Sequence, residues 1–392
     1  MVAKAHGTAV LVGQLEVGGR AAGLEHPVML SGRPTTVQCV PDTPPPARQA
    51  VGIDVVAVGS AIVDVLAETE DQVLGRLGLV KGTMALVDSA SADRLYRAMG
   101  PAVEASGGSA ANTVAGVASL GGSAAFIGRV RDDQLGAVFA HDLRAAGVRF
   151  TTPAATSGPA TARCLIFVTP DGERTMNTHL GAAACLEPED IDAGLIADSR
   201  LVYLEGYLWD PPQAKQALRR TVALARETGA EVALTLSDPF CVERHREEFL
   251  ELIDSGVGVL FANAVELTSL FQVGGLDQAL GLVSSRCSVA AVTRGPAGSV
   301  VVAGDQVLAV DAHPVERVVD TTGAGDLYAA GFLLGLARGV ALERCAQLGG
   351  LAAAEVIGHL GARPLVPLEA LAAEAGLLEP TAGGRRAAGR GP

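Results

Sequence analysis

Short apolar runs rich in β-branched residues alternate with longer helical patterns along most of this chain. The apolar runs lie at 53–59, 124–128, 201–204, 232–236, 257–261 and 289–293. The helical patterns lie at 110–120, 134–146, 211–228, 243–254 and 277–286. Strands that alternate with helices build βαβ units, in which the strands run parallel and helices cover both faces of the sheet. We therefore predict an α/β fold with three layers and a mostly parallel central sheet.

The composition limits the size class and the partners of the protein. With 392 residues, 49% of them hydrophobic, the chain can form one large domain or two smaller ones. The net charge of −13 argues against a nucleic-acid partner, which needs a basic face, although backbone N–H groups can still hold a nucleotide. The six cysteines are scattered without a CxxC pattern, which favours reduced thiols over a disulfide framework or a zinc site.

The two ends of the chain differ from the rest. Residues 1–50 are rich in Gly and Pro and show no sustained period, so we expect a poorly ordered extension and hypothesise a misassigned upstream start. Residues 377–392 are expected to form a disordered tail, which leaves 51–376 as the folded domain. We see neither a signal-peptide pattern nor an apolar run that suits a membrane span, so we expect a cytoplasmic protein without a membrane partner.

The segment 320–326, Asp-Thr-Thr-Gly-Ala-Gly-Asp, predicts an anion-binding site at the start of a helix. Gly323 and Gly325 let a ligand approach the backbone, and the free N–H groups of a helix start attract an anion. Asp326 would lie in the first turn, where a carboxylate is favoured, and could accept a proton from a substrate hydroxyl. An anion cradle beside a carboxylate suits phosphoryl transfer to an alcohol, whereas the simpler alternative is an N-capped helix after a glycine turn.

Two other phosphate-binding motifs fit this chain less well. The Rossmann fingerprint wants Gly or Ala where this chain has Tyr328. A Walker A loop is excluded, because none of the three lysines, Lys4, Lys81 and Lys215, stands in a Gly-Lys-Ser/Thr setting.

A second group of candidate residues surrounds Gly107-Gly108, which open a helix that carries Asn112. These glycines would let the backbone approach a ligand closely. Asp64 lies just past the run 53–59, and ligands of open α/β sheets bind outside the carboxyl ends of strands. Asp64 could therefore bind a pair of sugar hydroxyls, although a cap for Asp64 and an ordinary helix position for Asn112 remain alternatives.

Asn263 and Glu266 form a third group, directly after the run 257–261. Their spacing fits a capping box, in which each side chain satisfies the other residue's backbone N–H. It equally fits residues that order Mg²⁺ and its waters, since magnesium needs few direct protein ligands. The spacing alone does not choose between the two.

Two regions interrupt the βαβ alternation and predict a small β-sheet lid. Residues near 84–87, 163–168 and 175–178 resemble short alternating strands, and the last two flank an Asp-Gly turn typical of a hairpin. The segments assigned to this lid are about 65–106 and 160–182. A lid that excludes water would protect a phosphoryl donor from hydrolysis.

Taken in order, Gly-Gly-Ser-Ala-Ala-Asn at 107–112, Asn-x-x-Glu at 263–266 and the 320–326 segment resemble the PfkB/ribokinase family over roughly 53–365. The resemblance implies a ribokinase-like three-layer α/β/α sandwich with a small β-sheet lid, and a kinase domain at 51–376. Within the family the chain is most similar to the adenosine kinase branch. The stretches that carry this similarity are 59–64, 180–184, 204–208, 236–240 and 260–263. One departure is Ser60, where that branch usually has Asn after a glycine.

The resemblance implies ATP-dependent phosphorylation of the 5′-hydroxyl of a nucleoside, adenosine to AMP. Asp326 would be the base, and the backbone of Gly323, Ala324 and Gly325 would form the anion hole. The substrate pocket would contain Asp64, which grips the ribose hydroxyls, with Gly107, Gly108, Asn112, Ile62 and Leu180. The residues implied for ATP are Asn263, Thr293, Arg294, Gly295, Thr322, Gly325, Arg174 and Ala353. Mg²⁺ would be held through water by Glu266 and Asn263, and a K⁺ requirement stays open.

The acceptor is the main alternative left open. A sugar kinase of the ribokinase or fructokinase type would use the same machinery, but a bare sugar needs more polar closure than an adenine. Apolar candidates for an adenine slot favour adenosine: Ile62, Leu180, Leu208 and Phe240. A catalytically silent ligand-binding regulator is disfavoured because Asp326 and both glycines are present. The expected partners are a small-molecule substrate and ATP, in a monomer or a homodimer.

Overall fold

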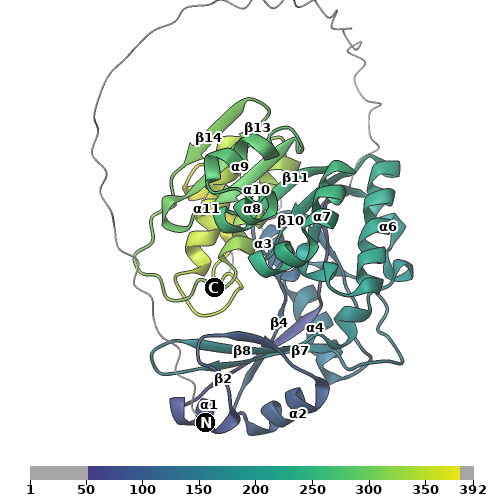
Figure 1. Ribbon diagram of the computed structural model, residues 1–392, viewed down its shortest axis with the longest axis vertical. Coiled ribbons are helices and arrows are strands. Elements are labelled where there is room, and N and C mark those ends of the chain that lie inside the picture. The colour runs from purple at the N-terminus through teal and green to yellow at the C-terminus, as the bar shows by residue number, and fades with distance from the viewer. Residues whose placement is uncertain (1–51, 380–392) are drawn as a thin grey trace, which may run out of the picture. The chain divides into compact units, whose positions relative to one another are not determined.

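The computed structural model describes residues 52–379, which contain one large and one small sheet (Figure 1). The nine strands of the large sheet follow the order β14-β13-β12-β11-β10-β9-β1-β5-β6. Their bounds are β1 Ile53–Val58, β5 Ala124–Ile127, β6 Arg149–Phe150, β9 Ser199–Glu205, β10 Glu231–Thr235, β11 Val257–Asn263, β12 Val289–Thr293, β13 Ser299–Ala303 and β14 Gln306–Val310. The pairs from β6 to β12 are parallel and the last two pairs are antiparallel, so the predicted, mostly parallel sheet is confirmed.

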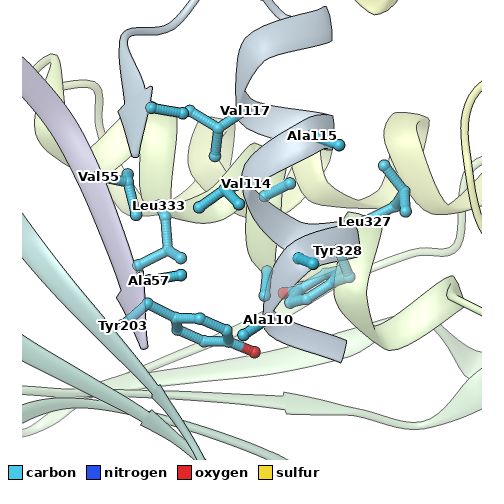
Figure 2. Packing of buried hydrophobic residues seen from close by; sticks show 14 of the residues in the cluster. Val55, Ala57, Ala110, Val114, Ala115, Val117, Tyr203, Leu327, Tyr328 and Leu333 are labelled. Atoms are coloured by element: carbon cyan, nitrogen blue, oxygen red, sulfur yellow. The ribbon is translucent and has the colours of Figure 1, made fainter. Parts of the chain in front are cut away.

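Strand β1 shows why helices must cover both faces of this sheet. Val55 and Ala57 pack into one hydrophobic cluster, and Val56 and Val58 pack into another. The first cluster involves α3 Ser109–Ser119, α4 Gln134–Ala145, α10 Ala324–Ala337, α11 Leu342–Val356 and α12 Leu368–Glu374. The second involves α5 Ala193–Ala197, α6 Pro212–Thr228, α7 Pro239–Asp254, α8 Ala264–Phe271 and α9 Leu276–Val283. Figure 2 shows Val55 and Ala57 against the side chains of α3 and α10, and the result is the predicted three-layer sandwich.

The small sheet, called the lid sheet below, has the strand order β3-β8-β7-β2-β4. Its bounds are β2 Ile62–Glu68, β3 Met84–Leu86, β4 Val103–Gly107, β7 Ala162–Val168 and β8 Arg174–His179. The antiparallel pairing of β7 and β8 confirms the predicted hairpin. One face carries Val63 and Val65, which share a buried cluster with residues of α1 Asp71–Leu77 and α2 Ser89–Ala98. Short 3-10 turns complete the fold: η1 Gly181–Cys185, η2 Pro188–Asp190, η3 Gly206–Trp209 and η4 Gly295–Ala297.

Several elements differ from the expectation. Strand β2 starts only a few residues after β1, so Asp64 lies inside a lid strand and not in a turn past the end of β1. The β13–β14 hairpin was not anticipated, because its two short runs lack a helix between them.

The ends of the chain lie largely outside the described residues, including the predicted extension at 1–50. Leu377 and Leu378, which were predicted to belong to the tail, are part of the fold: the Leu377 N–H donates to the Ala372 carbonyl at 2.8 Å, and Leu378 is buried. That boundary was placed too early. Within residues 52–379 five cysteines are free thiols, and none of the helices there is long and apolar enough to cross a membrane.

Candidate active site

A cavity of about 520 Å³ lies at the carboxyl ends of the large-sheet strands and is closed on one side by the lid sheet. The residues that follow or end β1, β9, β10, β11 and β12 line it: Ser60, Glu205, Thr235, Asn263 and Thr293. The lid sheet contributes Ile62, Asp64, Met84, Leu86, Cys164, Ile166, Met176 and Thr178. This is the edge at which open α/β sheets bind ligands.

The 320–326 segment forms the start of α10, as predicted, and its glycines face the cavity. Gly323 is the N-cap, with φ of 79°, and a Cβ there would lie 2.8 Å from the Ala362 side chain. A Cβ on Gly325 would meet no atom within 4 Å, so the backbone borders open space. First-turn N–H groups have no partner inside their own helix, and here they border the cavity. The arrangement suits an anion bound at the helix start.

Asp326 projects from the first turn of α10 and is held by two side chains of α3. The Ser109 hydroxyl donates to Oδ1 at 2.7 Å, and the Asn112 amide donates to Oδ2 at 2.9 Å. Burial raises the pKa of Asp326, and these two hydrogen bonds oppose the rise. Asn112 lines the cavity as expected, but its amide nitrogen orients Asp326, while its Oδ1 is buried without a hydrogen-bond partner. The carboxylate is therefore oriented before any ligand arrives.

Gly107 and Gly108 are required by a contact with the protein itself. A Cβ on Gly107 would lie 2.3 Å from an Asp64 carboxylate oxygen. Gly108 has φ of 93°, and a Cβ there would lie 2.3 Å from the Ser60 carbonyl oxygen. Gly108 lines the cavity, whereas Gly107 does not line it and instead leaves room for the Asp64 side chain. At Gly107 the backbone therefore closely approaches the Asp64 side chain, where a close approach to a ligand was expected.

Asp64 faces the cavity from the middle of β2, between Ala105 of β4 and Cys164 of β7. Burial raises its pKa to about 6, and the positive charges of Arg363 and Arg174 limit the rise. A carboxylate in this setting can accept hydrogen bonds from neighbouring hydroxyl groups.

Glu205 and Arg363 are among the charged residues near the site that were not predicted as functional. Glu205 ends β9, is fully buried, and accepts the N–H groups of Ser60 at 2.7 Å and Ala110 at 3.0 Å. Burial raises the pKa of Glu205. A carboxylate at the end of an apolar strand was a usable sequence signal. Arg363, in the loop after α11, gave no such signal.

Asn263 and Glu266 form the capping box, and they also line the cavity. Glu266 accepts the Asn263 N–H at 2.9 Å and the Asn263 amide at 2.7 Å, and Asn263 Oδ1 accepts the Glu266 N–H at 2.8 Å. Burial raises the pKa of Glu266 to about 7. Within residues 52–379, the acidic, His and Cys side chains form no cluster of three suited to a metal. The pair fits an ion held through water, because each carboxylate oxygen keeps a second lone pair.

The remaining predicted residues divide into those that reach the cavity and those that do not. Those that line it are Ile62, Leu180, Thr293, Thr322 and Ala324. Those that lie outside its lining are Arg174, Arg294, Gly295, Ala353, Leu208 and Phe240. Leu208 is 1% exposed in the core and Phe240 is 71% exposed at the surface, so neither contributes to the apolar slot.

Arg174, for which a contact with a phosphate was predicted, makes an ion pair within the protein. It extends from β8 of the lid sheet, and its Nη2 lies 2.6 Å from a carboxylate oxygen of Asp320. Each side chain is 8% exposed. Asp320 also accepts the Thr322 hydroxyl at 2.7 Å and the Gly361 N–H at 2.9 Å. The lid sheet and the loop before α10 are therefore joined by a buried charge pair.

A helix start that suits an anion and an oriented carboxylate, set in a three-layer fold with a lid, are features typical of small-molecule kinases. The family model for the pfkB family carbohydrate kinases matches residues 54–369. The chain belongs to the PfkB family, and it is an ATP-dependent sugar or nucleoside kinase of that family.

Solved structures and curated sequences give similar proteins along most of the chain. The crystal structure of adenosine kinase from Sinorhizobium meliloti is 54% identical, with a TM-score of 0.77, and the match covers 82% of this chain and 99% of that chain. A probable sugar kinase protein from Rhizobium etli CFN 42 is 50% identical, with a TM-score of 0.78, over 83% of this chain and 99% of that one. The ATP-dependent ribose-1-phosphate kinase of Halopiger xanaduensis is 33% identical over 293 residues, 72% of this chain and 92% of that protein. The resemblance to the adenosine kinase branch is confirmed.

Proposed function

We propose that this protein transfers the γ-phosphoryl group of ATP to the 5′-hydroxyl of adenosine and forms AMP and ADP. The observation that carries the proposal is the composition of the lid wall of the cavity. Around Asp64 it is largely apolar, with Ile62, Met84, Leu86, Ile166 and Met176. A nucleoside presents two hydroxyls and a flat apolar base, which suit one carboxylate beside an apolar surface. The 54% identity to the S. meliloti adenosine kinase supports the same acceptor.

The groups that line the cavity suit the following chemistry. Asp326 accepts the proton of the 5′-hydroxyl while the 5′-oxygen forms a bond to the γ-phosphorus. The bond between this phosphorus and the β–γ bridging oxygen breaks, and ADP leaves. The first-turn N–H groups of α10 stabilise the negative charge on the γ-phosphoryl oxygens. Asp64 accepts hydrogen bonds from the 2′- and 3′-hydroxyls of the ribose. Ser109 and Asn112 keep the Asp326 carboxylate in a fixed orientation.

Mg²⁺ would be held through water by Glu266 and Asn263, and it would neutralise donor phosphate charge. Thr293 and Thr322 line the cavity beside these residues and would contact the donor. Arg294, Gly295 and Ala353 would contact the more distant part of the nucleotide. Arg174 would reach a phosphate only by exchanging its Asp320 partner, since this pair is buried.

A sugar kinase is the second candidate, because the 50% identical R. etli protein carries the name of a probable sugar kinase. The deciding experiment measures ADP formation by the purified protein with Mg·ATP and, separately, adenosine, inosine, ribose or fructose. Chromatographic comparison of the product with 5′-AMP and 3′-AMP standards, with detection by mass spectrometry, identifies the site of transfer. Turnover with adenosine and little with the sugars is the expected result, whereas turnover with a sugar and none with adenosine would overturn it. Replacing K⁺ by Na⁺ in the same assay tests a potassium requirement.

A further inference from the structure

Arg363 makes an unusual set of contacts next to the active site without lining the cavity. Its side chain is half-buried and gives four hydrogen bonds. Nε and Nη2 donate to the Ser106 carbonyl at 3.2 and 3.0 Å, and Nη2 also donates to the Ser106 hydroxyl at 2.9 Å. Nη1 donates to the Ala111 carbonyl at 2.8 Å. One planar guanidinium therefore joins both ends of a short segment, which a flexible ammonium group could not do in the same geometry.

The segment between these two carbonyls carries much of the site. It contains the two glycines that pack against Asp64 and Ser60, and it contains Ser109, whose hydroxyl binds Asp326. Asn112, which binds the other oxygen of Asp326, follows directly. A shift of residues 106–112 would therefore move the partners of Asp326 and the packing surface of Asp64 together.

The positive charge of Arg363 also acts on two carboxylates of the site, Asp326 and Asp64. Besides burial, the groups that act on the pKa of Asp326 are Ser109 and Asn112 of α3 and Arg363 of the loop after α11. The negative charge of Asp326 in turn raises the pKa of Asp64 of β2, of Tyr203 and Glu205 of β9, and of Tyr207 of η3. The positive charge of Arg363 lowers the pKa of Asp326, which burial raises, and it lowers the pKa of Asp64 as well. Burial lowers the pKa of Arg363 itself to about 10, which leaves the guanidinium charged at neutral pH.

We propose that Arg363 is a positioning residue of the phosphoryl transfer: it clamps segment 106–112 and thereby fixes Asp326 and Asp64 relative to each other. The role in transfer rests on the function proposed above, whereas the clamp itself does not. The two parts are therefore tested by separate measurements.

The clamp is tested by hydrogen–deuterium exchange of the full chain, with no substrate present. Arg363→Met removes all four hydrogen bonds, and we expect faster exchange of the amides in 106–113. The matched control is Arg338→Met, because Arg338 is also half-buried and donates to a backbone carbonyl, that of Gly121, at 2.6 Å beyond the other end of α3. Unchanged exchange of 106–113 in Arg363→Met, or an equal increase in Arg338→Met, would overturn the clamp whatever the substrate is.

The role in transfer is tested by the pH dependence of kcat with the accepted substrate. We expect Arg363→Met to lower kcat by roughly 10- to 100-fold with a smaller change in KM, since a displacement of about 1 Å at a reacting group costs up to ~10²-fold. Loss of the positive charge raises the pKa of Asp326, so the acidic limb of the kcat profile moves to higher pH. If the acidic limb of Arg363→Met lay at the wild-type pH and its kcat were within twofold of wild type, the role would be contradicted.

Arg363→Lys separates charge from geometry and serves if the Met variant does not fold. Lysine keeps the positive charge but lacks the planar set of guanidinium N–H donors. The acidic limb of the variant's kcat profile should therefore stay near that of wild type, while kcat itself remains lowered. A Lys variant equal to wild type in kcat and in amide exchange would show that the planar set of donors is not needed. Failure of every acceptor in the turnover assay would reject the proposed function, and the exchange data would still decide the clamp.

Discussion

The two sides of the cavity are constructed differently. On the side of the large sheet, the polar groups are tied to the protein: Asp326 accepts two side-chain hydrogen bonds, Glu205 accepts two backbone N–H groups, and Glu266 is held by Asn263. On the side of the lid sheet, Met84 and Leu86 are 50% and 60% exposed although they line the cavity. On the large-sheet side the carboxylates are oriented in advance, and the lid side offers apolar surface that a ligand can cover.

This difference corresponds to two tasks. Groups that stabilise developing charge are most effective when they are oriented before the reaction, because they then need no reorganisation. Affinity for the acceptor can instead come from apolar surface that becomes buried on binding. We therefore expect substitutions on the large-sheet side to act on kcat, and substitutions on the lid side to act on KM.

The largest effect is expected from Asp326→Asn. An amide cannot accept the proton of the acceptor hydroxyl, so kcat should fall by at least ~10²-fold, the usual scale for loss of a general base. The shape of the side chain is retained, and adenosine should bind with nearly the wild-type Kd. Steady-state kinetics and calorimetric titration with adenosine measure the two quantities. An unchanged kcat would refute the base assignment.

Asp64→Asn tests the carboxylate that the lid sheet contributes to the cavity lining. Loss of charge-assisted hydrogen bonds, which contribute about 1.5–3 kcal/mol, corresponds to roughly a 10- to 100-fold fall in kcat/KM for adenosine, mostly through KM. Steady-state kinetics with adenosine measure kcat and KM of this variant. If Asp64→Asn lowered kcat and left KM unchanged, the division of tasks between the two sides would be wrong.

The pKa of Asp64 gives the same test without a change of sequence. Its value of about 6 means that the carboxylate is ionised at neutral pH and becomes protonated as pH falls through about 6. A protonated carboxyl is a poorer acceptor, so KM for adenosine should rise as pH falls through this range. The rise should be absent in Asp64→Asn, measured as KM between pH 5 and 8. A wild-type KM that does not change with pH would contradict the proposal that Asp64 accepts hydrogen bonds from the ribose hydroxyls.

The same contrast explains what the sequence could and could not predict. The start of α10 was predictable because Gly323, Gly325 and Asp326 are neighbours in sequence, and local backbone chemistry decides their geometry. The βαβ alternation likewise reports burial on both faces of each strand. The pair Arg174–Asp320 was not predictable, because it joins two elements distant in sequence through side chains. Arg363 binds Ser106 from a loop more than 250 residues away, where no local pattern marks it.

Strand β2 illustrates the intermediate case. The residues Ile62–Glu68 alternate between buried and partly exposed positions, which is the signal of a strand. They follow β1 so closely that the two strands resemble one run that ends in a turn. The chain leaves the large sheet and enters the lid sheet within 59–61, and only tertiary pairing with β4 and β7 shows it.

The smallest predicted effect separates an adenine slot from general stability of the lid sheet. Leu86→Ser removes an apolar side chain from the cavity wall, and since full burial of a Leu contributes about 1.5–3 kcal/mol, partial burial should correspond to roughly a 3- to 30-fold rise in KM for adenosine. The matched control is Val103→Ser, because Val103 lies on the other edge strand of the lid sheet and is 68% exposed, but does not line the cavity. Equal effects of the two substitutions would indicate that the lid sheet itself is weakened. A rise in KM confined to Leu86→Ser would instead assign the apolar wall to the base of the nucleoside, which a bare sugar does not possess.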